Sequence, residues 1–115
     1  MADGTLAHIN QLDPIMAPKA LAFINYARSR LKLPAVITSS TRSPQEQAAL
    51  VAVGRSKTLQ SKHLSGRAFD VDMYGWNRDA VPAWVWSELG PSASLFGLTW
   101  GGDWQTFKDV GHFEI

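Results

Sequence analysis

Cysteine is absent from this chain of 115 residues. Its absence excludes disulfide bonds, cysteine-bound zinc and thiol catalysis, so any bound metal must be held by histidine, aspartate or glutamate. Histidine is scarce as well, because the chain has only three, His8, His63 and His112. We expect His8 to lie in a mobile N-terminal segment without an acidic motif, which leaves His63 and His112 as the candidate imidazole ligands.

The chain also lacks an excess of one charge and a long apolar run. The 11 basic and 10 acidic residues are mixed and give a net charge of +1, which disfavours a nucleic-acid partner. No apolar run approaches the ~20 residues of a membrane-spanning helix. The N-terminus has no basic region followed by an apolar one, as a secretory signal requires. We therefore expect synthesis in the cytoplasm without a signal peptide, and no stable membrane insertion.

The composition that remains is typical of a globular protein, with 45% apolar and 18% charged residues. The length predicts a single domain over residues 1–115. Apolar spacing predicts a helix over Lys19–Leu31, and Ser43-Pro44-Gln45-Glu46 is a capping box that predicts a second helix, ending near Gly54. A third helical stretch, Ala80–Phe96, is expected to break at Gly90-Pro91. Short strands are predicted at residues 35–41, 68–73, 98–100 and 112–115, and this order of elements indicates a small α+β domain.

Two short motifs carry the candidate chemistry. In the first, His63 and Asp70 flank Gly66, which lets the backbone turn tightly enough for both side chains to converge. In the second, Asp109 precedes His112 by three residues. Either motif alone also fits ordinary surface or core residues, since such spacings often arise by chance. Together, two imidazoles and one carboxylate form the ligand set of a catalytic zinc with one position left for water, and Asp109 stands where a general base is needed.

At these motifs and beyond them, the chain resembles the LAS-type (M15-like) zinc peptidases. The pattern Ser61-x-His63-x-x-Gly66-x-Ala68-x-Asp70, followed by Asp109-x-x-His112, is similar to their signature. The family includes D-alanyl-D-alanine carboxypeptidases, D-Ala-D-Ala dipeptidases and phage L-alanyl-D-glutamate endopeptidases. Residues 41–47 and 97–104 resemble further segments of the phage and spore cell-wall endopeptidases. The resemblance implies an antiparallel sheet flanked by helices, which these enzymes share with hedgehog signalling domains.

The resemblance also implies roles for individual residues. Three residues match the Zn²⁺ ligands: His63, Asp70 and His112. Asp109 matches the catalytic carboxylate, and Arg42 matches an arginine that steadies the substrate carbonyl or the developing oxyanion. Ser61 and Gln47 match motif positions for which substrate contact and local structural support both stay open.

Other conspicuous residues fit structural roles better than catalytic ones. Trp100 and Trp104 could stack on glycan, but tryptophan beside Gly-Gly is more often packed in the core or at its rim. Asp72 is expected to be a solvated or hydrogen-bonded strand carboxylate rather than an extra metal or Ca²⁺ ligand, and Glu114 to support the site rather than to act as its base. Asp103, or a backbone carbonyl, is expected to hold the second ring nitrogen of a ligating histidine.

The sequence therefore predicts a zinc-dependent peptidoglycan hydrolase of the phage endolysin type. It would act as a monomer on the cell wall and cleave the L-Ala–D-Glu bond of the stem peptide, in host-cell lysis and with antimicrobial effect. Two alternatives stay open: a carboxypeptidase or dipeptidase acting on D-Ala-D-Ala, and a non-catalytic, zinc-bearing binding domain.

Overall fold

The computed structural model describes residues 4–40, 49, 52, 66–105 and 108–115. The predicted helix over residues 43–54 and four predicted site residues lie outside these ranges: Arg42, Gln47, Ser61 and His63. Among the described residues, no helix combines the length and the apolar character needed to cross a membrane.

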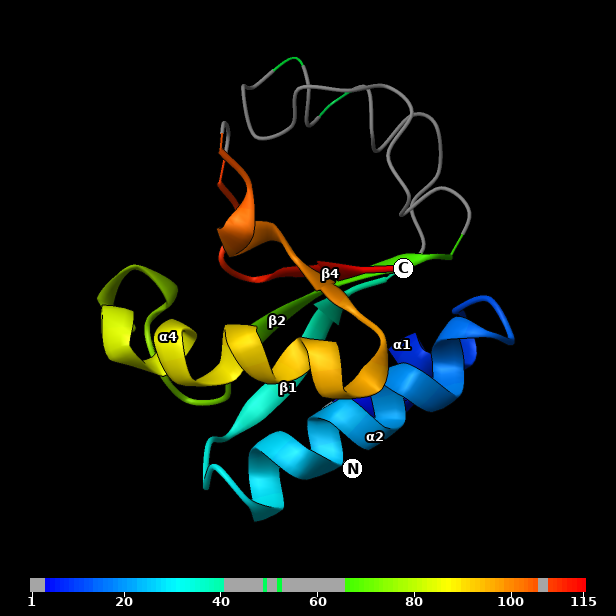
Figure 1. Cartoon of the computed structure of the whole chain (residues 1–115), viewed down its shortest axis with the longest axis horizontal. Helices are drawn as coiled ribbons and strands as arrows, with labels where there is room; N and C mark the ends of the chain where they lie inside the picture. Colours follow the sequence, from blue (N-terminus) through cyan, green and yellow to red (C-terminus); the bar gives the residue numbers. More distant parts are fainter. Residues whose placement is uncertain (1–3, 41–48, 50–51, 53–65, 106–107) are drawn as a thin grey trace.

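The described strands form one antiparallel sheet in the order β1-β2-β4-β3 (Figure 1). Their bounds are β1 Ala35–Ser39, β2 Ala68–Met73, β3 Thr99–Trp100 and β4 His112–Glu114. Along β2, Phe69, Val71 and Met73 are buried, whereas Asp70 and Asp72 are half-buried, because alternate side chains of a strand point to opposite faces. The predicted α+β class, with its antiparallel sheet, is confirmed.

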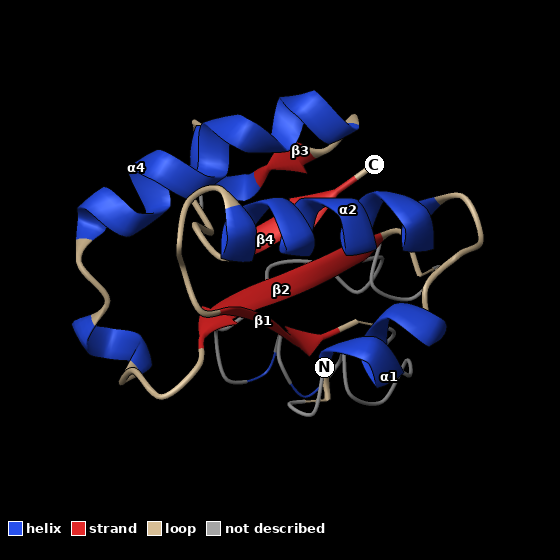
Figure 2. Ribbon diagram, turned by 90° about the horizontal axis from the view of Figure 1, so that it is seen from below, coloured by secondary structure: helices blue, strands red, loops and turns tan. Residues whose placement is uncertain are grey.

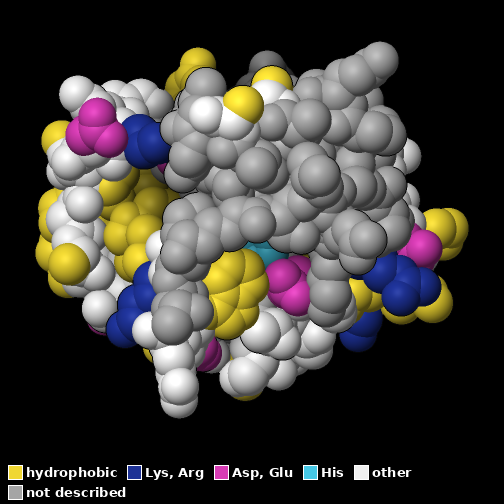
Figure 3. Space-filling model, turned by 90° about the horizontal axis from the view of Figure 1, so that it is seen from above, with side chains coloured by type: hydrophobic (Ala, Val, Ile, Leu, Met, Phe, Trp, Pro, Cys, Tyr) yellow, Lys and Arg dark blue, Asp and Glu magenta, His cyan; other side chains and the backbone are white. Residues whose placement is uncertain are grey.

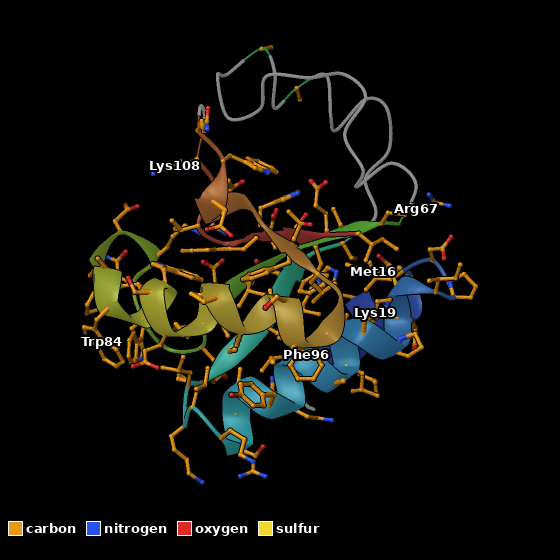
Figure 4. All side chains as sticks on the ribbon, viewed as in Figure 1. Met16, Lys19, Arg67, Trp84, Phe96 and Lys108 are labelled. Carbon is orange, nitrogen blue, oxygen red and sulfur yellow. The ribbon has the colours of Figure 1, made fainter. Side chains whose placement is uncertain are left out.

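Two helices, α2 (Met16–Ser29) and α4 (Ala83–Ser92), lie together on one face of the sheet (Figures 1 and 2). Phe23 of α2 packs against β2 and β4, with its ring centroid 4.7 Å from Phe113 and 6.2 Å from Phe69. Phe96, which lies over α2 (Figure 4), closes this core with its ring 5.9 Å from Phe23. The opposite face of the sheet thus keeps the polar side chains of β2 and β4.

From Gly4 onward the N-terminal segment is folded, contrary to the expectation for His8. Helix α1 spans Thr5–Asn10, and it contacts β1 and α2. Thr5 is fully buried, and its hydroxyl oxygen accepts a hydrogen bond of 3.1 Å from the backbone N–H of Ile37. His8 Nδ1 lies 2.8 Å from the hydroxyl of Ser40. These contacts join residues more than 30 positions apart, so no local pattern in the sequence indicates them.

Helix α4 continues through Gly90-Pro91, so the predicted break at this pair was wrong in position. The helix ends at Ser92, where the 3₁₀ helix η3 (Ala93–Phe96) follows. A Cβ on Gly90 would lie 2.2 Å from the indole of Trp100, so glycine is required for the helix to pack on β3. Two further 3₁₀ turns complete the described elements, η2 (Arg78–Ala80) and η4 (Gly101–Asp103).

Candidate metal centre

The centre of the site is a pair of residues on adjacent strands. Asp70 of β2 and His112 of β4 are direct partners in the antiparallel register, and their side chains meet on the face that the helices leave uncovered. His112 Nδ1 lies 3.3 Å from Asp70 Oδ1. Seen from above (Figure 3), a histidine, an acidic side chain and a hydrophobic group meet on this side of the molecule.

The other ring nitrogen of His112 is held by Glu114. Nε2 lies 2.8 Å from Oε1 of Glu114. A carboxylate only accepts hydrogen bonds, so Nε2 must carry the proton and donate it. In the neutral ring, Nδ1 is then the nitrogen with the lone pair, and it faces Asp70. At this ring nitrogen of His112, Glu114 takes the place expected for Asp103 or a backbone carbonyl. The geometry therefore favours the supporting role predicted for Glu114.

Asp109 reaches the same place through a tight backbone turn. Its carbonyl accepts a 3.1 Å hydrogen bond from the backbone N–H of His112, and its own N–H donates to the carbonyl of Gly101 at 3.1 Å. A Cβ on Gly101 would lie 2.4 Å from the carbonyl oxygen of Asp109. Only glycine therefore allows the turn that carries Asp109 to approach η4 so closely.

The described residues include a group that could hold a metal ion. Asp70, Asp109 and His112 each offer one ligand atom, and these atoms all lie within 4.8 Å of one another. Two ligands of a tetrahedral zinc with bonds of about 2.05 Å are about 3.4 Å apart, which agrees with the 3.3 Å between His112 Nδ1 and Asp70 Oδ1. The nitrogen and oxygen donors of this set also fit the preference of Zn²⁺.

The pKa of His112 lies above its ordinary value. Burial of the ring acts to lower the pKa, but the hydrogen bond and negative charge of Asp70, followed by those of Glu114, outweigh it. The two carboxylates thus stabilise a proton on the ring. A metal ion at Nδ1 must displace this proton, which couples metal binding to pH.

Two tryptophans near the site have different surroundings. The Trp100 indole is held between Gly90 and Gly102, and its Nε1 donates to the carbonyl of Val110 at 2.7 Å. Trp104 is half-buried, and its ring centroid lies 5.0 Å from that of His112. Trp100 is therefore a packing residue that also fixes the backbone just before β4, whereas Trp104 forms one wall beside the candidate ligand.

Asp72 does not belong to the metal cluster that the described residues form. Its oxygens accept hydrogen bonds from the Arg78 guanidinium and from the Thr38 hydroxyl. The expectation of a hydrogen-bonded strand carboxylate agrees with these contacts.

The structure thus brings together the predicted residues Asp70, Asp109 and His112, whereas His63 lies outside the described residues. Sequence reasoning missed the structural role of Gly101 and the contribution of Arg78 beside Asp72. The Gly101-Gly102 pair was a visible signal, because adjacent glycines often mark a close approach of backbones. For Arg78 the sequence offered no signal, since its contact depends on the path of the chain after β2.

Comparison with known proteins places these features in a family. The model of the peptidase family M15, described as D-alanyl-D-alanine carboxypeptidase, matches residues 54–115, more than half of the chain. An L-alanyl-D-glutamate peptidase of Listeria phage A118 is 30% identical over 96% of this chain. The peptidoglycan L-alanyl-D-glutamate endopeptidase CwlK of Bacillus subtilis is 32% identical over 92% of this chain and 74% of its own length. The chain spans only 40% of the length of the phage relative.

Solved structures agree in fold. The match to the L-Ala D-Glu endopeptidase ChiX of Serratia marcescens spans 100% of this chain and 88% of the ChiX chain. Its TM-score is 0.79, at 23% sequence identity. A second match is the D,D-pentapeptidase VanY of a VanB-type resistance cassette, solved as a mutant with Zn(II). This match has a TM-score of 0.68 at 18% identity, and it spans 90% of this chain and 71% of the VanY chain. The matched family model and the related Bacillus sequence show that this chain belongs to the M15 family of peptidases.

Proposed function

We propose that this protein is a zinc-dependent peptidoglycan endopeptidase that cleaves the bond between L-Ala and D-Glu of the stem peptide. The observation that carries the proposal is the convergence of Asp70, Asp109 and His112 on one point of the sheet. The named activity of the phage and Bacillus relatives supports the choice of bond. Residues 1–115 are proposed to form one peptidase domain.

The proposed ligands of the zinc ion are His63, Asp70 and His112. Bound zinc would lower the pKa of a coordinated water and polarise the scissile carbonyl. Within the described residues, Asp70 Oδ1 and His112 Nδ1 offer the donor atoms, and Glu114 keeps the proton on Nε2 so that Nδ1 can bind a cation.

Asp109 is proposed to be the general base rather than a ligand. It is exposed, whereas His112 is buried and Asp70 half-buried, so its carboxylate can meet substrate and water. It takes up the proton of the attacking water and then gives it to the leaving amine, as general acid–base catalysis requires. Arg42, which matches the family's arginine, is proposed to stabilise the negative charge that develops on the carbonyl oxygen. Ser61 and Gln47 are proposed to contact or support the bound substrate.

The proposal is tested by digesting purified murein, with a dye-release assay in the presence and absence of a chelator. We expect release only with metal, and recovery when Zn²⁺ is added back. Mass spectrometry of the products then identifies the bond. A new N-terminal D-Glu supports the endopeptidase, and released D-Ala supports a D,D-peptidase, the activity that describes the matched family model. Binding to murein without any product would instead support a non-catalytic binding domain.

In the cell, the proposed role is that of an endolysin, a phage enzyme that degrades the host cell wall during lysis. The phage relative supports this assignment. The protein would be made in the host cytoplasm, act on the wall as a monomer, and kill susceptible bacteria when added from outside.

A further inference from the structure

A second charged group lies next to the metal centre on the same face of β2. Asp72 accepts a hydrogen bond of 2.9 Å from Nε of Arg78 at Oδ1 and a second one from Nη2 at Oδ2. The Thr38 hydroxyl donates to Asp72 Oδ2 at 3.0 Å. Arg–carboxylate pairs of this two-point kind hold the guanidinium in a fixed orientation. Arg78 is therefore held at two points by Asp72, which is itself fixed by Thr38 of β1.

The turn after β2 explains why Arg78 returns to this position. Gly75 adopts a φ of +80°, a backbone conformation that residues other than glycine rarely adopt. Asn77 then starts the short helix η2, with its side-chain oxygen accepting a 3.0 Å hydrogen bond from the N–H of Asp79. The chain reverses over these residues, and the Arg78 side chain comes to lie beside Asp72.

Arg78 is within electrostatic reach of the site. Asp70 and Asp72 are alternate residues on one strand face, so they lie about 7 Å apart. The pKa of Arg78 is raised, first by its hydrogen bond to Asp72 and further by the negative charges of Asp72, Asp70 and Asp109. Among the described residues, the guanidinium is thus a cation that Asp72 holds two residues along β2 from the candidate metal ligand Asp70.

The outer edge of the guanidinium is available to a ligand. Arginine has five N–H donors, and Asp72 engages Nε and one N–H of Nη2. Within the part of the chain that the structure describes, Nη1 has no hydrogen-bond partner, and the side chain is 53% exposed. A second carboxylate can therefore bind at the edge that Nη1 and Nη2 share, next to the edge held by Asp72.

The proposed substrate carries a free carboxylate close to its scissile bond. The amino group of D-Glu is acylated by L-Ala, and D-Glu has two carboxyl groups, of which one continues the peptide. The other remains as a carboxylate next to the scissile bond. It lies three to five bonds from the scissile carbonyl carbon, or roughly 4–6 Å. Asp72, which holds the guanidinium, lies two residues along β2 from Asp70 at the metal centre, about 7 Å at the backbone, which is of the same order as this span.

We propose that Arg78 is a specificity residue that binds the free carboxylate of the D-Glu residue after the scissile bond, with Asp72 and Thr38 as its positioning residues. The inference rests on the proposed function. A bidentate, charge-assisted contact on a half-exposed side chain should favour the carboxylate over the uncharged carboxamide by about tenfold. The negative charges of Asp70, Asp72 and Asp109 would repel an anionic substrate. A cation at this position would offset that repulsion.

The test uses two synthetic stem peptides that differ only in this group, one with the D-Glu carboxylate and one with the carboxamide. For the zinc-loaded protein we expect kcat/KM about tenfold higher on the carboxylate peptide. Arg78→Gln should lose this preference by raising KM for the carboxylate peptide alone, and Arg78→Lys should keep part of it as a point charge. Asp72→Asn should weaken the preference, because the anchor loses its charge. Arg30→Gln, at an exposed arginine of the α2 C-terminus, is the matched control and should behave as wild type.

Equal losses on both peptides, or no loss on either, in Arg78→Gln would overturn the assignment. Calorimetric binding of the two peptides to wild type and Arg78→Gln provides a readout that does not depend on turnover. If the wild type hydrolyses neither peptide, the proposed function fails. A carboxylate preference in binding that Arg78→Gln removes would then still support the role of Arg78, and binding without such a preference would refute it.

Discussion

Replacement of Gly101 by alanine is expected to displace Asp109, the proposed general base, without unfolding the domain. The new Cβ would lie 2.4 Å from the carbonyl oxygen of Asp109, 3.3 Å from its carbonyl carbon and 3.1 Å from Cβ of His112. Ordinary contact begins at 3.4 Å, so the backbone of Asp109 must move by 3.4 − 2.4 = 1.0 Å. A shift of about 1 Å in a catalytic group costs roughly 100-fold in rate. Overpacking at the same point should cost about 1–3 kcal/mol of stability.

The measurement is kcat/KM on a stem peptide, together with the thermal midpoint by circular dichroism. Gly4→Ala is the matched control, because a Cβ there meets nothing within 4 Å while the positive φ of 84° carries a strain of about 1 kcal/mol. Both variants should lose stability by similar amounts, but only Gly101→Ala should lose activity. Wild-type kcat/KM in a folded Gly101→Ala protein would refute the claim that this close approach positions Asp109.

Further predictions concern the support of the site and the fold. Glu114→Ala should weaken zinc binding about 10- to 100-fold, measured by competition with a chromophoric chelator. Glu114→Gln should lose less affinity, because its side chain can still accept a hydrogen bond. Equal zinc affinities for wild type and both variants would contradict the role of Glu114. Without metal, the raised pKa of His112 means that its protonation stabilises the fold below about pH 6.5, and that this contribution disappears as the pH rises through the raised pKa. The thermal midpoint of the metal-free protein should therefore fall above about pH 6.5 in wild type and not in His112→Gln, and parallel curves would argue against the effect. Gly90→Ala should reduce the free energy of unfolding by at least about 1–3 kcal/mol, because its Cβ would lie 2.2 Å from the Trp100 ring; an unchanged denaturant midpoint would show that the indole can move aside.

The sequence predicted those features that depend on neighbouring residues. The alternation from Ala68 to Met73 placed Asp70 on the polar face of a strand, as the structure shows. The three-residue spacing placed Asp109 near His112, where a backbone hydrogen bond of 3.1 Å now joins them. In the turn that leads into α2, Asp13 accepts a 2.8 Å hydrogen bond from the N–H of Ile15. The helix nevertheless begins at Met16, three residues before the predicted Lys19.

Features that depend on long-range contacts were not predictable in this way. The register that pairs Asp70 with His112 joins residues 42 positions apart, and no periodicity encodes it. The Gly90-Pro91 pair normally interrupts a helix, but packing against Trp100 keeps α4 helical to Ser92. The N-terminal helix likewise depends on the burial of Thr5 beneath β1.

The central claim is that Asp109 acts as the base at a zinc ion that other residues hold. Zinc content and murein hydrolysis of Asp109→Asn, measured on the same preparation, test it most directly. The account predicts zinc bound at the wild-type stoichiometry and a fall in the hydrolysis rate of about 100-fold or more. Hydrolysis at the wild-type rate, or loss of zinc from the folded variant, would contradict it.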